Sequence, residues 1–326
     1  MQPSITALPI KPSRLQGLSE RLIDSHYVNN YGGAARRLGA IEAALAEFEP
    51  ATGAGFRLAG MLRERLAAQN SMLLHEHYFA ALGGNGASPE GPLAAAIARD
   101  FGSFAAWRGQ FVALARALAG GSGWALLLHD SRAGRLVNQW APDHLHALAG
   151  ARPILALDMY EHAYHLDFGA DANGYIEAAL GNLDWPRLER LYAAALLGQA
   201  PPTAPDQPPD DLLTAEALRA SPSAFVLLDV RLPGDRAKAL LGIVGARWCP
   251  PEALGEWATA QAPARPVAVY CVYGFQVSID AAARLRRHGV KVHRLAGGLA
   301  AWRALGGELA EVAADVRVRT EVRPVE

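Results

Sequence analysis

Histidines and one carboxylate at three places in the N-terminal part of the chain have the types and spacing of metal ligands. His26 follows Leu22 by one helical turn, and His75 lies on a predicted helix among apolar and aromatic residues. The third place is the stretch LALDMYEHAYH, which puts Asp158 at a strand end and His162 four residues later. A buried imidazole needs partners for both ring nitrogens, which metal ligation and a hydrogen-bond acceptor together supply. Three imidazoles and one carboxylate suit iron or manganese, whereas an all-thiolate set would indicate zinc or an iron–sulfur cluster.

Taken singly, each of these residues can also be interpreted as a structural residue without a metal. A lone inward histidine such as His26 is more often a hydrogen-bonded core residue, and Asp158 could simply cap a turn. His144 and His146 form an H-x-H pair, and His77 lies two residues after His75. These three are expected to be solvated polar residues, and a second metal site built from them is the less favoured alternative. His129 lies in the predicted turn HDSRAG and is expected at the surface.

A cysteine in the C-terminal part has the setting of a reactive thiol. Cys271 follows the apolar run VAVY and precedes a loop that leads into a helix near Ser278. Backbone N–H groups at a helix N-terminus favour an anion, which stabilises a thiolate. The alternative is a small buried side chain at a strand end, a common role of cysteine. Cys249, in WCPPEAL, is expected to be structural.

The residues that precede a proline-rich segment predict helices, then a small sheet, then helix again. Helical periodicity starts after Ser19 and covers about residues 33–49, 56–82 and 92–118. The runs WALLLHD, RLVNQWA and PILALD are split by turn residues and predict three strands. We therefore expect an α+β domain, with a helical hairpin followed by an α/β part that holds a three-stranded antiparallel sheet.

The proline-rich segment GQAPPTAPDQPPDD divides the chain. Proline disfavours both helix and sheet ladder, so this segment predicts a semi-rigid linker. After it, the runs FVLLDV, VAVYC and VKVHRL alternate with helical stretches, which predicts an α/β domain with a parallel sheet. The expected parts are an N-terminal domain (1–197), the linker (198–211), a C-terminal domain (212–312) and a tail (313–326).

Composition narrows the partners and the compartment. A length of 326 residues favours two domains, and a net charge of -1 gives no sign of a nucleic-acid partner. No apolar run is long enough to span a bilayer, and the first residues lack the pattern of a secretion signal. The cysteine count of two excludes a disulfide framework and fits a reducing compartment, so we expect a cytoplasmic protein.

The N-terminal motifs resemble those of a known enzyme family. The stretch from Asp158 to Tyr164 is similar to the metal-binding signature of the iron/manganese superoxide dismutases, and residues 99–123 with Trp124 are similar to that family's central region. The resemblance covers about residues 15–195 and implies conversion of superoxide to oxygen and hydrogen peroxide, with one iron or manganese ion per subunit. It also implies a homodimer or a higher assembly, in which Glu161 bridges to a ligand histidine of a second subunit. The implied metal ligands are His26, His75, Asp158 and His162.

The residues expected around these ligands depart from the family pattern. Ala34 and Asn30 stand where the family has a gateway tyrosine and a histidine, and Tyr160 replaces a tryptophan. The family's glutamine near the solvent ligand falls at Ser71 or Val137. Four residues are candidates to replace these missing side chains, because each can donate or accept a hydrogen bond across a small cavity. These are Tyr31, Asn138, Gln139 and His165.

The C-terminal motifs DVRLPGD, IVGARW, YCVYG and AGGLAAW resemble a rhodanese domain over about residues 212–310. Cys271 falls on that family's persulfide-carrying cysteine. The loop from Cys271 to Ser278 is one residue longer than the common rhodanese loop and contains no arginine. A longer loop resembles the phosphatase- and arsenate-reductase-like members, whose pocket fits a tetrahedral oxyanion, while Phe275 and Val277 make the rim apolar.

Three hypotheses follow. The first is an active superoxide dismutase with an appended rhodanese-like thiol domain, in which peroxide from one domain oxidises Cys271 of the other. The second is a sulfurtransferase or oxyanion reductase that uses Cys271, with the N-terminal domain as a dimerising metal-binding scaffold. The third is a metal-binding scaffold, without enzymatic activity, that presents the rhodanese pocket to a partner protein.

Overall fold

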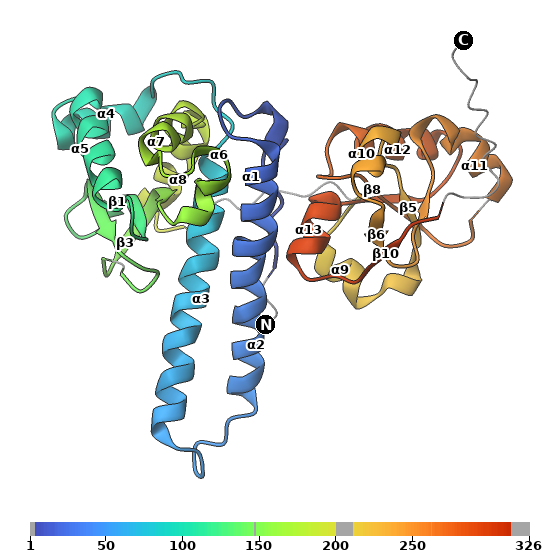
Figure 1. Cartoon of the computed structure of the whole chain (residues 1–326), viewed down its shortest axis with the longest axis horizontal. Coiled ribbons are helices and arrows are strands. Elements are labelled where there is room, and N and C mark those ends of the chain that lie inside the picture. Colours follow the sequence, from blue (N-terminus) through green and yellow to red (C-terminus); the bar gives the residue numbers. More distant parts are fainter. Residues whose placement is uncertain (1–3, 147, 200–210, 262, 314–326) are drawn as a thin grey trace. The chain divides into compact units, whose positions relative to one another are not determined.

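The computed structural model describes residues 4–146, 148–199, 211–261 and 263–313. The described residues form two compact units (Figure 1). Residues from Leu8 to 199 make up the N-terminal unit, and residues 211–313 together with Ser4–Ala7 make up the C-terminal unit. Most of the predicted linker and nearly all of the predicted tail lie outside the described residues, so the domain boundaries stay a prediction.

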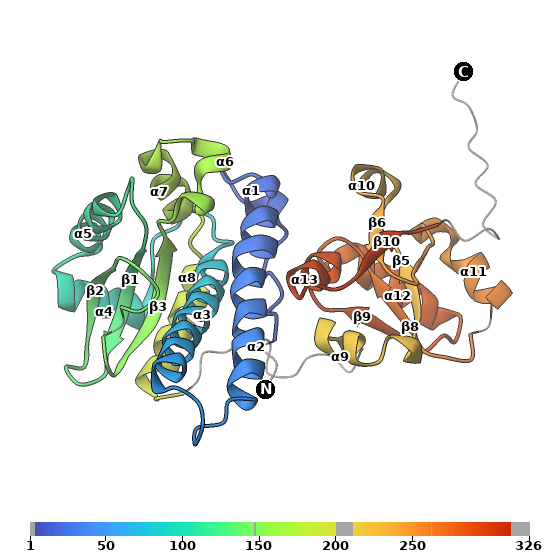
Figure 2. The same cartoon turned by 60° about the horizontal axis from the view of Figure 1, so that its bottom comes forward.

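The N-terminal unit starts with helices that form a long antiparallel hairpin, as expected (Figures 1 and 2). After the short 3₁₀ turn η1 (Pro12–Arg14), the segments in chain order are α1 (Glu20–Ser25), the π-helical turn η2 (His26–Tyr31), α2 (Gly32–Ala46) and α3 (Gly55–Ala81). Ser19 caps α1, because its hydroxyl accepts a hydrogen bond from the N–H of Leu22 at 3.0 Å. The π-helical turn joins α1 to α2 without a break, and α3 returns alongside α2.

The rest of the N-terminal unit is a small sheet covered by helices. Its elements are α4 (Gly91–Phe101), α5 (Phe104–Ala117), β1 (Trp124–Asp130), β2 (Arg135–Ala141), β3 (Ala151–Asp158), the 3₁₀ turn η3 (Glu161–Ala163), α6 (His165–Phe168), α7 (Ala172–Gly181) and α8 (Trp185–Leu196). The sheet is antiparallel with the order β2-β1-β3, and α3 and α8 pack against β3. This confirms the α+β prediction, and β1 and β2 have the bounds of WALLLHD and RLVNQWA. No helix of the described residues combines the length and the apolar character that crossing a bilayer requires.

The C-terminal unit is an α/β fold with a parallel sheet, which confirms the second fold prediction. Its elements are β4 (Leu212–Leu213), α9 (Ala215–Ala220), η4 (Pro222–Ala224), β5 (Val226–Asp229), α10 (Pro233–Lys238), β6 (Leu241–Ile243), β7 (Arg247–Trp248), η5 (Pro251–Ala253), α11 (Leu254–Gln261), β8 (Val267–Tyr270), α12 (Gln276–Arg287), β9 (Val292–Leu295), α13 (Gly298–Ala304) and β10 (Leu309–Glu311). The five-stranded parallel sheet has the order β4-β9-β8-β5-β7, and β6 pairs with β10 in a separate antiparallel ribbon.

Two apolar clusters pack on the C-terminal unit's sheet. One contains Leu218 of α9 and Trp302 of α13, and the other contains Trp257 of α11 and Leu285 of α12. Residues Ser4–Ala7 belong to this unit. The Ile5 side chain packs on the cluster that contains Leu218 and Trp302, and the N–H of Ile5 donates to the Glu216 carboxylate at 2.7 Å. This N-terminal segment, Ser4–Ala7, was not predicted to belong to the C-terminal unit.

His129 lies in the core, although the sequence predicted a surface position. It belongs to β1, the central strand, and its ring meets the ring of Tyr192 edge-on at 6.0 Å. Only 5% of the residue is exposed, and neither ring nitrogen has a hydrogen-bond partner among the described residues. Burial therefore lowers the pKa of His129, because the charged imidazolium loses its hydration.

We predict that His129 makes the N-terminal unit sensitive to acid. Because the folded-state pKa lies below the unfolded value of 6.5, the unfolded chain binds the proton first, and the stability of the folded unit falls as the pH drops through 6.5. Replacing His129 by phenylalanine should make the melting temperature of this unit fall less between pH 7.5 and pH 5.5, measured by scanning calorimetry. His146→Gln, at an exposed histidine, should follow the wild type. Equal pH slopes for His129→Phe and wild type would contradict the prediction.

Candidate metal centre

The first histidine of the predicted set is placed by the π-helical turn. His26 is the first residue of η2 and is fully buried. A π-helical turn is wider than an α-helical turn and re-aims the side chains that it carries, and such turns are common at functional sites. The Nε2 atom of His26 lies 3.0 Å from Oδ2 of Asp158, while its Nδ1 atom has no hydrogen-bond partner among the described residues.

The second histidine is fixed by its own helix. Nδ1 of His75 lies 2.7 Å from the main-chain oxygen of Ser71, one turn earlier in α3. A carbonyl oxygen can only accept, so Nδ1 carries the proton and Nε2 keeps a bare lone pair. That Nε2 atom is buried, has no hydrogen-bond partner among the described residues, and lies 3.4 Å from Oδ2 of Asp158. A buried lone pair without a donor is the situation that a cation relieves.

Asp158 ends β3 and is oriented by contacts that leave one oxygen for the site. Its Oδ1 atom accepts the N–H of Tyr160 at 2.9 Å, and its main-chain oxygen accepts the hydroxyl of Tyr175 at 2.7 Å. Its Oδ2 atom faces the histidines. His162 lies four residues later in η3, with Nε2 at 3.2 Å from the same oxygen.

The structure thus brings all four predicted ligands together. One ligand atom from each of His26, His75, Asp158 and His162 lies within 4.8 Å of the other three. Three imidazole nitrogens converge on one carboxylate oxygen, which cannot satisfy them all by hydrogen bonding. The set of donors, three neutral nitrogens and one carboxylate, fits iron or manganese.

Burial and pairing set the charge states that this site needs. Burial lowers the pKa of His26 and lowers that of His75 to about 3, so both imidazoles are neutral near pH 7. Burial alone would raise the pKa of Asp158, but hydrogen bonds from His162 and His26 outweigh it and the pKa is lowered. Neutral imidazoles and an ionised carboxylate are the forms that bind metals.

Tyr31 is the one candidate of the surrounding shell that the structure places beside the ligands. It ends the π-helical turn, is buried, and has its ring centroid 6.4 Å from that of His75. Its hydroxyl donates to the carboxylate of Glu76 at 2.8 Å. The family pattern has a tyrosine at position 34, where this chain has Ala34. Tyr31, three residues earlier, places a tyrosine near the ligands instead.

The other three candidates of that shell make their contacts elsewhere. Asn138 accepts from Nε1 of Trp107 at 3.2 Å, and the Gln139 amide binds the main chain of His146 and Leu148. These bonds hold the sheet and the loop that follows it. His165 is exposed at the start of α6.

His144 is a site residue that sequence reasoning missed. It was expected to be solvated, but it is partly buried, because its ring stacks on Tyr160 at 5.0 Å and Tyr160 stacks on His162 at 5.4 Å. Nε1 of Trp124 donates to Nδ1 of His144 at 2.9 Å, and Asn70 of α3 holds the main-chain oxygen of His144 at 2.6 Å. The available signal in the sequence was the position of His144 shortly after β2. In the sheet order β2-β1-β3, Asp158 ends the strand β3 on the other side of β1.

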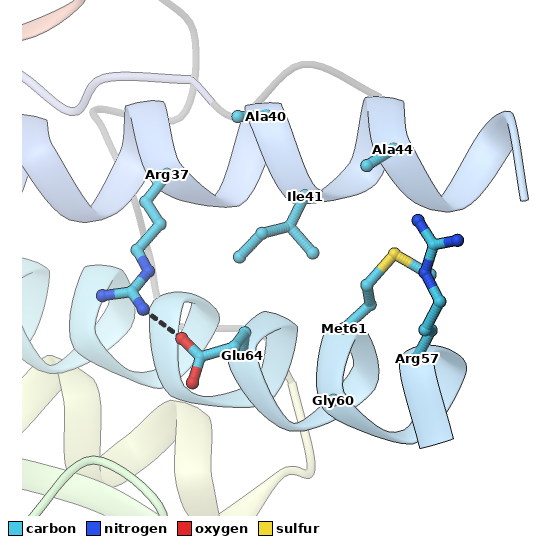
Figure 3. A pocket seen from close by; sticks show the side chains of 8 residues that line it. All are labelled: Arg37, Ala40, Ile41, Ala44, Arg57, Gly60, Met61 and Glu64. Carbon is cyan, nitrogen blue, oxygen red and sulfur yellow. Dashed lines mark hydrogen bonds and ion pairs between the residues drawn. The ribbon is translucent and has the colours of Figure 1, made fainter. Parts of the chain in front are cut away.

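A groove of about 490 Å³ lies between α2 and α3, away from this chemistry (Figure 3). Apolar side chains such as Ile41 and Met61 line it, and an ion pair between Arg37 and Glu64 crosses one end. Glu64 precedes His75 by eleven residues of α3, which corresponds to about 16 Å along a helix. The groove contains no ligand-type histidine or cysteine.

Cys271, the predicted nucleophile of the second motif, comes directly after β8 in the C-terminal unit. The residue is 6% exposed, and neither it nor Cys249 is in a disulfide.

Comparison with known proteins matches both units to families. Residues 89–191 match the C-terminal domain of iron/manganese superoxide dismutases, and residues 213–305 match the rhodanese-like domain. An iron superoxide dismutase of Cupriavidus metallidurans is 56% identical over 189 residues, which are 58% of this chain and 95% of that protein. A manganese superoxide dismutase of Haloferax volcanii is 36% identical over 181 residues, 55% of this chain and 89% of that protein. One of Mycolicibacterium smegmatis is 36% identical over 156 residues, 47% and 75% of the two chains.

The chain therefore belongs to the iron/manganese superoxide dismutase family. A rhodanese-like domain follows the superoxide dismutase domain in the same chain, as the motifs predicted.

We predict that the Oδ2 charge of Asp158 is needed for metal binding. Asp158→Asn keeps the shape of the side chain but removes the charge, so bound iron or manganese should fall at least about tenfold, measured by elemental analysis of the purified protein. Asp143→Asn, at a partly exposed acid outside the cluster, should retain the metal content of the wild type. Full metal content in Asp158→Asn with native circular dichroism would refute the assignment.

Proposed function

We propose that this protein is a superoxide dismutase that converts two superoxide ions and two protons to oxygen and hydrogen peroxide. The observation that carries the proposal is the convergence of three imidazole nitrogens and one carboxylate oxygen within 4.8 Å, in a chain of this family. Iron or manganese bound by these four residues supplies a one-electron redox change in both directions. We propose His26, His75, Asp158 and His162 as the ligands.

The charges of the ligand residues favour the substrate. The imidazoles are neutral and Asp158 supplies a single negative charge, so a divalent or trivalent ion leaves the site net positive. Superoxide is a small anion, and a positive site surrounded by buried aromatic groups attracts it strongly because the local dielectric is low. Tyr78, Phe79 and Trp124 supply such groups around the histidine rings.

The reaction consumes protons, and we propose that His144 offers a hydrogen-bond donor at the edge of the site. Its Nδ1 atom accepts from Trp124, so in the neutral ring the proton sits on Nε2. Stacking on Tyr160 and the hydrogen bond from Asn70 fix the ring in this orientation. Burial lowers the pKa of His144, which keeps the ring neutral and so keeps Nδ1 able to accept from Trp124 while Nε2 carries the hydrogen. Tyr31, held by Glu76, is the second proposed donor.

We further propose a homodimer or higher assembly that works in the cytoplasm. Glu161 precedes the ligand His162 and has an exposed side chain, so it is available to bridge to a ligand histidine of a second subunit. Cys249 and Cys271 both remain outside disulfides, which fits a reducing compartment.

The sulfurtransferase or oxyanion-reductase alternative places the activity at Cys271 and makes a separable prediction. If the dismutase proposal holds, His162→Ala should lose superoxide dismutase activity by at least about a hundredfold, because a ligand is lost. Cys271→Ser should keep wild-type dismutase activity. The measurement is inhibition of cytochrome c reduction by protein of known metal content. The alternative would be favoured if the measured activity were lost in Cys271→Ser and kept in His162→Ala. Stoichiometric metal without superoxide turnover in the wild type would favour a non-enzymatic scaffold.

We predict that His144 affects turnover more than metal binding. His144→Ala should keep its metal but lose about tenfold in turnover, because a positioned hydrogen-bond donor is removed. His144→Gln, which can still donate, should recover part of the loss. His146→Ala, two residues further along the same loop and exposed, serves as the matched control and should resemble the wild type. An unchanged rate in His144→Ala at full metal content would remove His144 from the mechanism.

A further inference from the structure

The loop that follows Cys271 is held by its carbonyl groups. The N–H groups of Leu299 and Ala300, at the start of α13, donate to the main-chain oxygens of Cys271 and Val272, each at 2.9 Å. Gly298 makes this possible, because a Cβ atom there would lie 2.4 Å from the oxygen of Cys271. The carbonyl groups of the loop are therefore tied to one side.

Three N–H groups of the same loop have no acceptor among the described residues. Val272, Gly274 and Phe275 donate no main-chain hydrogen bond to another described residue, and α12 begins at Gln276 with no side chain capping it. Gly274 allows the turn, with φ at 79°, and a Cβ atom there would lie 2.9 Å from the main-chain nitrogen of Gly297. Unpaired N–H groups at the start of a twelve-residue helix favour negative charge beside them.

A buried hydroxyl gives the second, independent sign of a ligand. Ser278 is fully buried in the first turn of α12, and its Oγ atom has no hydrogen-bond partner among the described residues. It lies on the face that carries Ala281 and Ala282, which pack in the same apolar cluster as Cys271. The hydroxyl therefore lies on the inner side of the helix, at the end next to the cysteine loop.

The charge around this loop does not suit a doubly charged oxyanion. The residues from Cys271 to Ser278 include no lysine, arginine or histidine. Arg231 is buried near this end of the sheet, but its guanidinium is bound to the Asp229 carboxylate and to the main-chain oxygen of Ala239. Thiosulfate, phosphate and arsenate are bound most tightly by guanidinium groups that remain free for them. A small uncharged substrate fits the neutral loop better.

The two cysteines cannot pair without moving the sheet. Trp248 and Tyr270 both align with Asp229 of β5, so Cys249 and Cys271 lie level with Val230 on the strands to either side. Two strand spacings put their Cα atoms roughly 9 to 10 Å apart, whereas a disulfide needs less than about 7 Å. All three side chains pack in one cluster, which places Val230 between the two sulfur atoms. The thiol of Cys249 is also engaged, with Sγ 3.9 Å from the oxygen of Pro250.

We propose that Cys271 is a site for two-electron oxidation by hydrogen peroxide, and that its oxidised form is resolved by a low-molecular-weight thiol rather than by Cys249. This rests on the proposed function, because the dismutase unit of the same chain makes the peroxide. The Cys271 thiolate attacks one peroxide oxygen, the S–O bond forms and the O–O bond breaks. Hydroxide leaves and takes up the proton that the thiol released. Sulfur loses two electrons and the peroxide gains them, which gives sulfenic acid and water.

The return to the thiol needs two equivalents of the external thiol. The first condenses with the sulfenic acid to a mixed disulfide and releases water. The second attacks the outer sulfur of the mixed disulfide, which restores the Cys271 thiol and releases the disulfide of the external thiol. Ser278 is a positioning residue in this scheme. Its hydroxyl donates to the sulfur while the sulfur is negatively charged, in a place where no other described residue accepts from it.

The test adds hydrogen peroxide directly to the reduced, metal-loaded full-length protein in the presence of dimedone, which traps sulfenic acid, and follows each cysteine by peptide mass spectrometry. We expect one dimedone adduct on Cys271 and none on Cys249. Ser278→Ala should slow labelling about tenfold, the effect expected from one hydrogen bond to a charged group. Ser278→Thr keeps the hydroxyl and should restore most of the rate. Cys249→Ser should label like the wild type.

Three outcomes would overturn the proposal. These are an unlabelled Cys271, a Cys249–Cys271 disulfide in place of the adduct, or a Ser278→Ala variant that folds and labels as fast as wild type. Transfer of sulfane sulfur from thiosulfate to Cys271, with no reaction with peroxide, would also overturn it in favour of sulfur transfer. Because peroxide is added, the same labelling in His162→Ala tests the thiol separately from dismutase activity. Labelling with no dismutase activity in the wild type would refute only the proposed function.

Discussion

The N-terminal unit depends on one carboxylate oxygen buried at the end of a strand. Oδ2 of Asp158 has no contact with water and lies within 3.4 Å of an Nε2 atom of each of three histidines. An isolated carboxylate in such a place would be strongly destabilising, so the elements around it must hold compensating groups in place. The π-helical turn, α3 and η3 each deliver one imidazole, while Tyr160 and Tyr175 orient the aspartate from its other side.

In the C-terminal unit, the corresponding hydrogen bonds are made by main-chain groups and not by side chains. The oxygens of Cys271 and Val272 are hydrogen-bonded to α13, and the N–H groups of Val272, Gly274 and Phe275 donate to no main-chain oxygen of the described residues. The position of Cys249, two strands away at the same level, keeps this thiol from an internal partner.

Much of this could be predicted because the signals are local. Alternation and apolar runs gave β1 and β2 with their correct ends, and helical periodicity gave α3 within a residue at each end. The four metal-ligand candidates could be chosen because each lies in a recognisable local setting, such as the four-residue step from Asp158 to His162. The predictions failed where a local pattern is ambiguous. His129 looked like a turn residue, but it belongs to the central strand, where α8 covers it with the ring of Tyr192.

The sequence by itself determined the candidate metal ligands, the order of the main helices and strands of the N-terminal unit, three strands of the C-terminal sheet, and a cysteine that precedes a helix. These properties follow from residue type and from spacing along the chain. Only the tertiary structure decided which polar residues surround the site. His144 stacks beside the ligands while Asn138, Gln139 and His165 make contacts elsewhere, because such contacts depend on strand pairing and helix packing between residues far apart in sequence. The separation of the two cysteines is likewise a property of strand order, which no local pattern contains.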